Sequence, residues 1–225
     1  MSDNKQTILK VLVGSQAHGL ATPDSDFDYR GVFIVPTEEL LWVGSKPKTT
    51  NWIEGDEDNT SWELGHFLQL ATKCNPTILE TFLAPTVEVT EEGKMIQEIF
   101  PHIWNSTDVM NAFIGYGHNQ RKKFLEKKDK WSNKYACAYL RTLYNAWELL
   151  STNTFTVKVA DTEIGEILKS WKKKMPIDGS VIDVCRFWEA KVRDAFTGNP
   201  TKETNYAAVN NVLLKIRQRH FLCQK

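Results

Sequence analysis

The chain of 225 residues lacks the sequence features of secreted proteins, of proteins with a structural metal site and of membrane proteins. Its four cysteines are far apart, with no Cys-x-x-Cys pair and no histidine at the spacing of a zinc ligand set. No apolar run is long enough to span a bilayer, and the polar beginning, MSDNKQ, is unlike a signal peptide. We therefore expect a reduced, soluble protein of the cytoplasm.

The chain also lacks a net charge, because 28 lysines and arginines balance 28 aspartates and glutamates. Overall charge therefore gives no attraction to nucleic acid, and any such contact has to come from a local basic patch. The apolar content of 41% and charged content of 25% are ordinary for a globular protein. The length allows one or two domains with a substantial core.

Short apolar segments alternate with turns in the first half. Residues 8–13 are predicted as a strand or as the end of a short helix leading into one, and further strands are predicted at 27–35 and 87–90. A hairpin is predicted over 49–62 with a polar turn at 54–58. Short helices are predicted at 37–41, with Thr37 as N-cap, and on both sides of the Asn75-Pro76 break, at 63–73 and 77–83.

From about Ser106 onward, the apolar spacing becomes helical over much longer stretches. Helices are predicted at 109–125, 134–150, 163–173, 181–196 and 206–221. The pattern predicts an α+β fold: a small mixed β-sheet with helices over residues 1–105, followed by an all-α C-terminal domain over residues 106–225.

The segment 11–36, VLVGSQAHGLATPDSDFDYRGVFIVP, is the most informative part of the chain. Gly14-Ser15 follows an apolar strand at the point where a helix is expected to begin. Glycine allows close backbone approach, and a helix start presents free N–H groups to a phosphate, to which Ser15 adds a hydroxyl. A plain Gly-Ser turn is the alternative interpretation.

Asp26 and Asp28 stand two residues apart at the beginning of the next strand, so their side chains are expected on one face. A solvent-facing strand edge is one explanation. The strand continues into a buried apolar run, however, and two acids at its mouth are costly unless a cation neutralises them. Carboxylates opposite phosphate-binding N–H groups predict a site for a divalent metal that carries a nucleoside triphosphate.

The string GSQAHGLATPDSDFDYRGVF resembles the fingerprint of the DNA polymerase beta-like nucleotidyltransferase superfamily. It is most similar to the branch of predicted nucleotidyltransferases associated with RNA repair in bacteria and phages. ELGHFLQLATKCNPTILETF resembles a helix, Asn-Pro and a Glu-bearing helix of that branch, and KYACAYLRTLYNAWELLSTNTF is a weaker match. The resemblance covers residues 8–85 well and 109–157 loosely, and makes 1–105 the catalytic domain.

The resemblance implies an enzyme that moves a nucleoside monophosphate from an NTP to a hydroxyl and releases pyrophosphate. Asp26 and Asp28 would bind Mg²⁺ or Mn²⁺, and Gly14 and Ser15 would hold the β- and γ-phosphates. A third carboxylate from a neighbouring strand would complete the metal site. We assign this role to Asp58.

Several other residues receive secondary assignments. Glu63 is the reserve for the third carboxylate, and Glu80 has only a supporting role. Candidates for nucleotide or phosphate contact, each with a structural alternative such as an ion pair, loop packing or a helix stop, are His18, Arg30, Asn75 and Arg141.

A basic stretch in the helical half is the candidate for nucleic-acid contact, although acidic residues dilute it and a solvated helix face is the alternative. Its members are Arg121, Lys122, Lys123, Lys127 and Lys128. A second lysine run, at 169–174, is interpreted as a solvated helix face.

Three functions remain open from the sequence. The first is nucleotidyl transfer to an RNA 3′ end. The second keeps the chemistry but uses a protein or small-molecule hydroxyl as acceptor, and it stays open because an RNA enzyme would more often be basic than neutral overall. The third is a non-catalytic nucleotide- or RNA-binding module, against which the intact Asp26 and Asp28 pair argues because bare acids repel phosphate.

Overall fold

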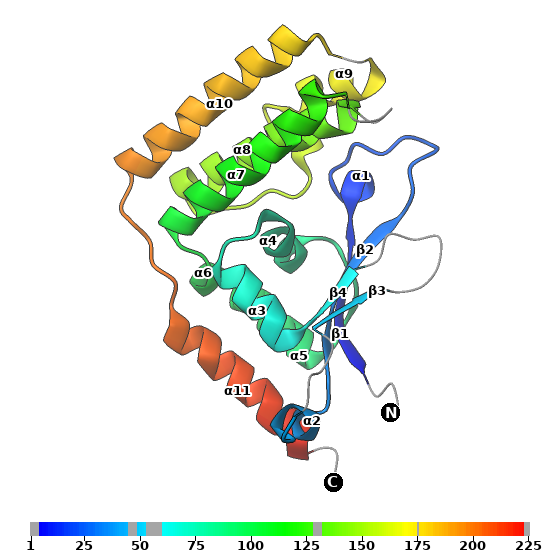
Figure 1. Cartoon of the computed structure of the whole chain (residues 1–225), viewed down its shortest axis with the longest axis vertical. Helices are drawn as coiled ribbons and strands as arrows, with labels where there is room; N and C mark the ends of the chain where they lie inside the picture. The colour runs from blue at the N-terminus through cyan, green and yellow to red at the C-terminus, as the bar shows by residue number, and fades with distance from the viewer. Residues whose placement is uncertain (1–4, 45–48, 53–59, 128–131, 175, 223–225) are drawn as a thin grey trace.

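The computed structural model describes residues 5–44, 49–52, 60–127, 132–174 and 176–222. Within these residues the chain has the predicted α+β architecture, with a mixed five-stranded sheet in the order β3-β4-β2-β1-β5. The strands are β1 (Gln6–Val13), β2 (Asp28–Ile34), β3 (Thr50–Trp52), β4 (Thr60–Glu63) and β5 (Thr86–Val89). Figure 1 shows the sheet along one side of the molecule, with helices packed on one of its faces.

The pairing of β1 with β2 fixes which side chains share a face of the sheet. The two strands are antiparallel, with Val13 opposite Asp28 and Val11 opposite Arg30. Opposite residues of an antiparallel pair point to the same face, so Asp28 and Arg30 lie on the face that buries Val11 and Val13. β2 also runs parallel to β4, and β4 pairs with β3 in the predicted hairpin.

The helices of the first half are α1 (Gly14–Ala17), α2 (Thr37–Leu41), α3 (Leu64–Thr72), α4 (Pro76–Leu83), α5 (Glu91–Glu98) and α6 (Phe100–Ile103). The predicted helices at 37–41, 63–73 and 77–83 are confirmed, whereas α5 and α6 were not predicted. The prediction that Thr37 caps α2 is wrong. Pro36 holds the N-cap position, and the Thr37 hydroxyl donates instead to the Arg217 carbonyl, 3.3 Å away.

The second half is helical, as predicted. Its elements are α7 (Ser106–Leu125), α8 (Ser132–Thr152), a 3₁₀ turn η1 (Val159–Asp161), α9 (Gly165–Lys173), α10 (Asp178–Gly198) and α11 (Tyr206–Leu222). Helices α7, α8 and α10 pack on one another, and α9 packs on α8 (Figure 1). None of the helices in the described residues is both long and apolar enough to cross a bilayer.

One hydrophobic core joins the two halves. It runs from the sheet through Phe67 of α3 to Phe113 of α7 and Leu140 of α8, all of which are fully buried. The last helix, α11, leaves the helical half and packs against α2, α3, α5 and α6 (Figure 1). The C-terminal helix therefore belongs to the packing of the first half.

Candidate active site

Gly14 and Asp28 form the centre of the candidate site. Gly14 follows β1 and begins α1 with a φ of +67°, a conformation that favours glycine. A Cβ at this position would collide with the Oδ2 atom of Asp28. The carboxylate of Asp28 therefore lies directly against the backbone of the Gly14-Ser15 corner. Both residues were predicted for the site from the sequence.

Asp26 lies just before β2, at the end of the loop that follows α1. Its side chain is exposed, and it forms no ion pair with another described residue. The loop is ordered by its own contacts: the Gln16 amide donates to the Ser25 carbonyl over 3.2 Å, and Ser25 Oγ accepts from Thr22 N over 2.8 Å. Asp26 thus presents its carboxylate to solvent two residues before Asp28.

The donor chemistry of Asp26 and Asp28 fits a divalent metal. Mg²⁺ and Mn²⁺ prefer oxygen ligands, and Mg²⁺ is usually held by one or two carboxylates together with water and substrate phosphates. The described residues contain no group of three or more His, Cys, Asp or Glu side chains able to hold a metal. The predicted third carboxylate, Asp58, lies outside the described residues.

Glu63, the reserve for the third carboxylate, is placed away from Asp28. It pairs with Phe33 in the register of β2 and β4, five strand positions beyond Asp28, or about 17 Å along the strand. Its carboxylate accepts from Gly65 N at 2.7 Å as the N-cap of α3 and forms a buried ion pair with Arg217 of α11. Glu63 therefore holds structural elements together at the opposite end of β2.

A buried ionic cluster includes Arg30, two strand positions from Asp28 on the same face, and contains four of the predicted or supporting residues. Arg30 Nη1 donates to Glu80 Oε2 at 2.8 Å and to the Thr77 carbonyl at 3.2 Å. Arg141 Nη1 of α8 lies 3.5 Å from the other carboxylate oxygen, Oε1. Glu80, on α4, is thus the shared partner of two arginines from different halves of the chain.

His18 completes this cluster. Its Nε2 lies 2.5 Å from Glu80 Oε1, and its ring is largely buried. Burial, and then the charge of Arg141, lower the pKa of His18, so the ring is neutral at pH 7. Burial alone would raise the pKa of Glu80, but Arg141, His18 and Arg30 together hold it well below its ordinary value. Glu80 is therefore an ionised carboxylate.

Hydrogen bonds from the helical half hold the loop after α1, which carries His18. The His18 carbonyl accepts from Ala160 N at 3.1 Å, and the Leu20 carbonyl accepts from Lys172 Nζ at 2.7 Å. A Cβ at Gly19, whose φ is +70°, would press on the Ala160 side chain. The interpretation of Lys172 as part of a solvated helix face is therefore wrong. The sequence of a lysine run does not indicate which of its members reaches the carbonyl of a distant residue.

Asn75 and the basic stretch have visible local roles. Asn75 Oδ1 accepts from Thr77 N at 3.0 Å and caps α4, which agrees with the interpretation of Asn75 as a helix stop.

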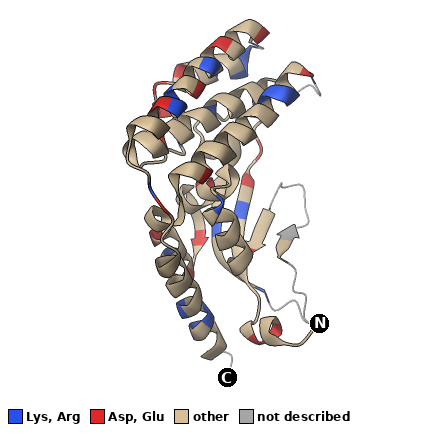
Figure 2. Ribbon diagram, turned by 60° about the vertical axis from the view of Figure 1, so that its left-hand side comes forward, with Lys and Arg blue, Asp and Glu red and all other residues tan. Residues whose placement is uncertain are grey.

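In the basic stretch, Lys122 Nζ lies 3.9 Å from Glu126 and Lys127 Nζ lies 3.8 Å from Asp178. Figure 2 shows acidic and basic residues interspersed along the helices. Arg121 and Lys123 also lie on α7, whereas Lys128 is outside the described residues.

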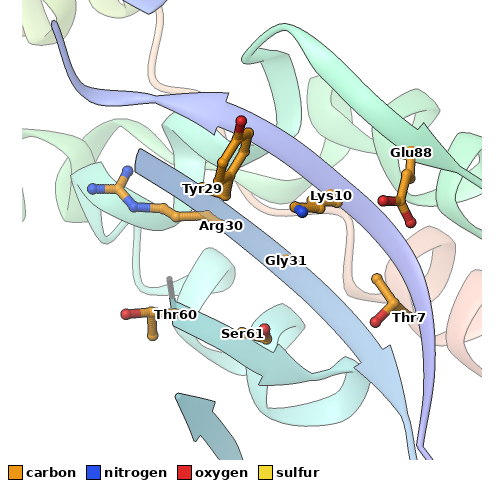
Figure 3. Close-up of a pocket in the computed structure, with 8 residues that line it drawn as sticks. All are labelled: Thr7, Lys10, Tyr29, Arg30, Gly31, Thr60, Ser61 and Glu88. Carbon is orange, nitrogen blue, oxygen red and sulfur yellow. The ribbon is translucent and has the colours of Figure 1, made fainter. Parts of the chain in front are cut away.

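A separate hollow of about 190 Å³ lies on the sheet (Figure 3). Its residues come from β1, β2, β4 and β5: Thr7, Lys10, Tyr29, Arg30, Gly31, Thr60, Ser61 and Glu88. Lys10 pairs with both Gly31 and Glu88 in the strand register. Because successive strand residues alternate in direction, Tyr29 and Gly31 point to the face opposite Asp28. The hollow therefore opens on the face opposite Asp28, although it shares Arg30 with the buried ionic cluster.

A strand followed by Gly-Ser, a short helix, and Asp-x-Asp at the start of an antiparallel partner strand is the arrangement expected from the resemblance to polymerase beta-like nucleotidyltransferases. Residues 2–175 match the RNA repair pathway DNA polymerase beta family, and the chain belongs to this family. This confirms the resemblance found in the sequence. The family is one of nucleotidyltransferases in RNA repair, a class that generally uses divalent metals.

The chain is also similar to the "Uncharacterized 38.9 kDa protein in nrdC-mobD intergenic region" of Enterobacteria phage T4. The two are 26% identical over 133 residues, which cover 53% of this chain and 39% of the phage protein. The chain thus spans well under half the length of that relative.

Proposed function

We propose that this protein transfers a nucleoside monophosphate from an NTP to the 3′ hydroxyl of an RNA. The acceptor oxygen bonds to the α-phosphorus, the bond between that phosphorus and the bridging oxygen breaks, and pyrophosphate leaves. The observation that carries the proposal is the Asp28 carboxylate resting against the Gly14-Ser15 corner, with Asp26 exposed beside it. Family membership supports it.

Each residue of the site has a role in this reaction. Asp26 and Asp28 would hold the divalent metals, whose charge would lower the pKa of the acceptor hydroxyl and offset the charge on the leaving pyrophosphate. The Gly14-Ser15 corner binds the β- and γ-phosphates through N–H and hydroxyl donors. Arg30 and Arg141, which both contact Glu80, supply positive charge for the triphosphate.

Asp58 supplies the third carboxylate and accepts the proton of the attacking hydroxyl. It precedes Thr60 by two residues, as Asp28 precedes Arg30, and Thr60 pairs with Arg30 in parallel strands. In this proposal residues 1–105 are the catalytic domain, and residues 106–225 contribute Arg141 and the RNA-binding surface. His18 and Asn75 position neighbouring parts of the site: His18 is hydrogen-bonded to Glu80, and Asn75 caps the start of α4.

The RNA strand lies along the basic end of α7. Lys122 and Lys123 line a hollow of about 320 Å³ there, together with Tyr116 and Gln120. Cations that neutralise phosphates next to an aromatic ring are suited to a single strand. The acids on this surface, Glu126 among them, keep the expected affinity moderate.

The proposal is tested by label transfer from each α-³²P-labelled NTP with Mg²⁺. The acceptors are RNA with a free 3′ hydroxyl, RNA with a 3′ phosphate, a protein mixture and an aminoglycoside. We expect label only on RNA with the free hydroxyl, and loss of at least about a hundredfold in Asp28→Asn. Asp24→Asn, an exposed acid of the same loop, is the matched control and keeps full activity.

Two results would contradict the proposal. Label on the protein or aminoglycoside alone would assign the second kind of acceptor. Metal-dependent NTP binding without transfer to any acceptor would identify a non-catalytic binding module.

A further inference from the structure

Glu80 brings together side chains from separate parts of the chain. The carboxylate is 2% exposed, and its partners are His18 after α1, Arg30 on β2 and Arg141 on α8. The contacts measure 2.5, 2.8 and 3.5 Å, respectively. One buried side chain therefore fixes the relative positions of the sheet, the Gly-Ser loop and the helical half.

The charges in this cluster do not cancel. Glu80 carries one negative charge, Arg30 and Arg141 carry one positive charge each, and His18 is neutral. A net positive charge in a mostly buried position is costly unless an anion faces it. The two arginines are thus placed to face a further anion, either the Asp28 carboxylate two strand positions from Arg30 or a phosphate group of the substrate.

The two guanidinium groups can reach that anion, whereas Glu80 cannot. The side chains of Arg30 and Arg141 keep 22% and 16% of their surface exposed, against 2% for Glu80. The bonds of Arg30 to Glu80 and Thr77 use only Nη1, and a guanidinium has five N–H donors. Arg30 also lies two strand positions from Asp28, on the same face.

We propose that Glu80 is a positioning residue that aligns Arg30 and Arg141 as a clamp for the leaving pyrophosphate. The inference rests on the proposed nucleotidyl transfer and adds the element that holds the leaving group. Glu80 touches neither the substrate nor the reacting atoms. Its carboxylate turns two arginines from opposite halves of the chain toward one phosphate group, where planar guanidinium groups bind phosphate oxygens in pairs.

A purely structural brace between the two halves is the competing explanation. Such a brace would affect the melting temperature without a selective effect on phosphate binding. The test therefore compares pyrophosphate binding with stability. It uses the full chain with Mg²⁺ and inorganic pyrophosphate as the probe, in calorimetric titration, beside the kcat and KM for NTP.

Two conservative variants disturb the alignment while keeping every charge. Glu80→Asp retracts the carboxylate by one methylene, and Arg141→Lys removes the planar fork. We expect each to weaken pyrophosphate binding about tenfold and to lower kcat up to about a hundredfold, the loss typical of a small misplacement. The combined variant should lose much less than the product of the two, because both act through one contact.

The matched control is Glu148→Asp in α8. Glu148 is also a buried carboxylate with short hydrogen bonds, which it accepts from Thr156 N and Oγ1 at 2.5 and 2.6 Å. It should change the melting temperature and leave pyrophosphate binding unaltered. If Glu80→Asp does not fold, Arg141→Lys, at a partly exposed position, decides the question.

The outcomes separate the clamp from the reaction. Transfer by the wild type, with unchanged pyrophosphate binding and kcat in the folded variants, would overturn the clamp alone. Independent, multiplicative losses in the combined variant would also overturn it, because they would show that Glu80 does not act through Arg141. Absence of transfer by the wild type would overturn the proposed function and the clamp with it.

Discussion

The carboxylate of Asp28 occupies the space that a side chain at position 14 would need. Gly14 has a φ of +67°, and an added Cβ would collide with Asp28 Oδ2. The two residues stand at the junction of β1 with α1 and at the start of β2, which pair side by side. The glycine is thus required both by its backbone conformation and by the carboxylate that lies on it.

Gly14→Ala should therefore impair both stability and transfer. A left-handed backbone costs a non-glycine residue about 1–2 kcal/mol, and the collision with Asp28 adds to this cost. We expect the free energy of unfolding to fall by at least about 2 kcal/mol in urea titrations, and transfer to fall with it as Asp28 is displaced. Gly115→Ala is the control, because its Cβ would meet nothing within 4 Å in the middle of α7; it should stabilise by about 0.5–1 kcal/mol.

Removal of the divalent metal should stop transfer and leave the fold intact. Asp26 is exposed and Asp28 lies against Gly14, so both are suited to a metal that arrives with the nucleotide, while the hydrophobic core is formed without it. With excess EDTA we expect no label transfer and an unchanged circular-dichroism spectrum, and Mn²⁺ should restore activity. Transfer that persists in EDTA would contradict the assignment of these acids.

Arg217→Met should destabilise the protein without affecting the chemistry. It would leave Glu63 as a buried carboxylate without its cation and remove a 3.1 Å bond to the Val35 carbonyl. Breaking a buried pair from one side costs on the order of 3 kcal/mol. Urea unfolding measures this loss. The control is Arg219→Met, a substitution at a nearby exposed position, which should change the free energy of unfolding by less than about 0.5 kcal/mol. A loss of kcat at a temperature where the variant is folded would argue against a structural role.

Stability should decline as the pH falls below 6.5. Burial, and then Arg141, lower the pKa of His18, so the unfolded chain takes up a proton near pH 6.5 while the folded chain does not. The unfolded state is therefore favoured progressively from pH 6.5 down to the folded pKa, by at most about 1.4 kcal/mol per pH unit for one group. Glu80 acts only at lower pH, because its pKa is held well below 4.5.

The variant His18→Gln isolates this effect. Burial also lowers the pKa of His220, so His220 makes the same contribution to the pH dependence of stability in the wild type and in the variant. We expect the melting temperature of the variant to change less than that of the wild type between pH 7.5 and 5.5. Equal slopes would show that His18 does not titrate differently in the folded state.

The basic end of α7 should determine the salt dependence of RNA binding. Replacing Lys122, Lys123 and Lys127 with glutamine removes three cations that can neutralise phosphates. For single strands each neutralised phosphate contributes about 0.7 to the slope of log affinity against log salt, so the slope should decrease by about 2. Fluorescence anisotropy with a short RNA measures it, and an unchanged slope would place the RNA elsewhere.

Much of the fold follows from local patterns. Helical apolar spacing located α7, α8 and α10, and the Asn75-Pro76 break was placed correctly because the Asn75 side chain caps α4 and proline fits its first turn. Residues 91–103 were missed: α5 and α6 are short, and α5 carries few apolar residues. The cap of α2 was also misassigned, because Thr37 has a distant partner on α11.

For the candidate site, sequence spacing predicted Gly14, Ser15, Asp26 and Asp28, because their expected placement depends on neighbours in the chain and on strand alternation; the structure brings Gly14 and Asp28 together. Sequence spacing did not reveal the centrality of Glu80, whose partners Arg30 and His18 are 50 and 62 residues away. It also did not predict that Glu63 pairs with Arg217, 154 residues away. Such pairings are set by how helices pack on the sheet.

The amino-acid order alone determined the strand–corner–strand unit and its acidic pair, since backbone freedom and two-residue alternation are local properties. Only the tertiary structure decided which charges meet in the interior. Burial makes an unpaired charge expensive, so distant segments are held in the one arrangement that brings Glu80 to its two arginines and Glu63 to Arg217.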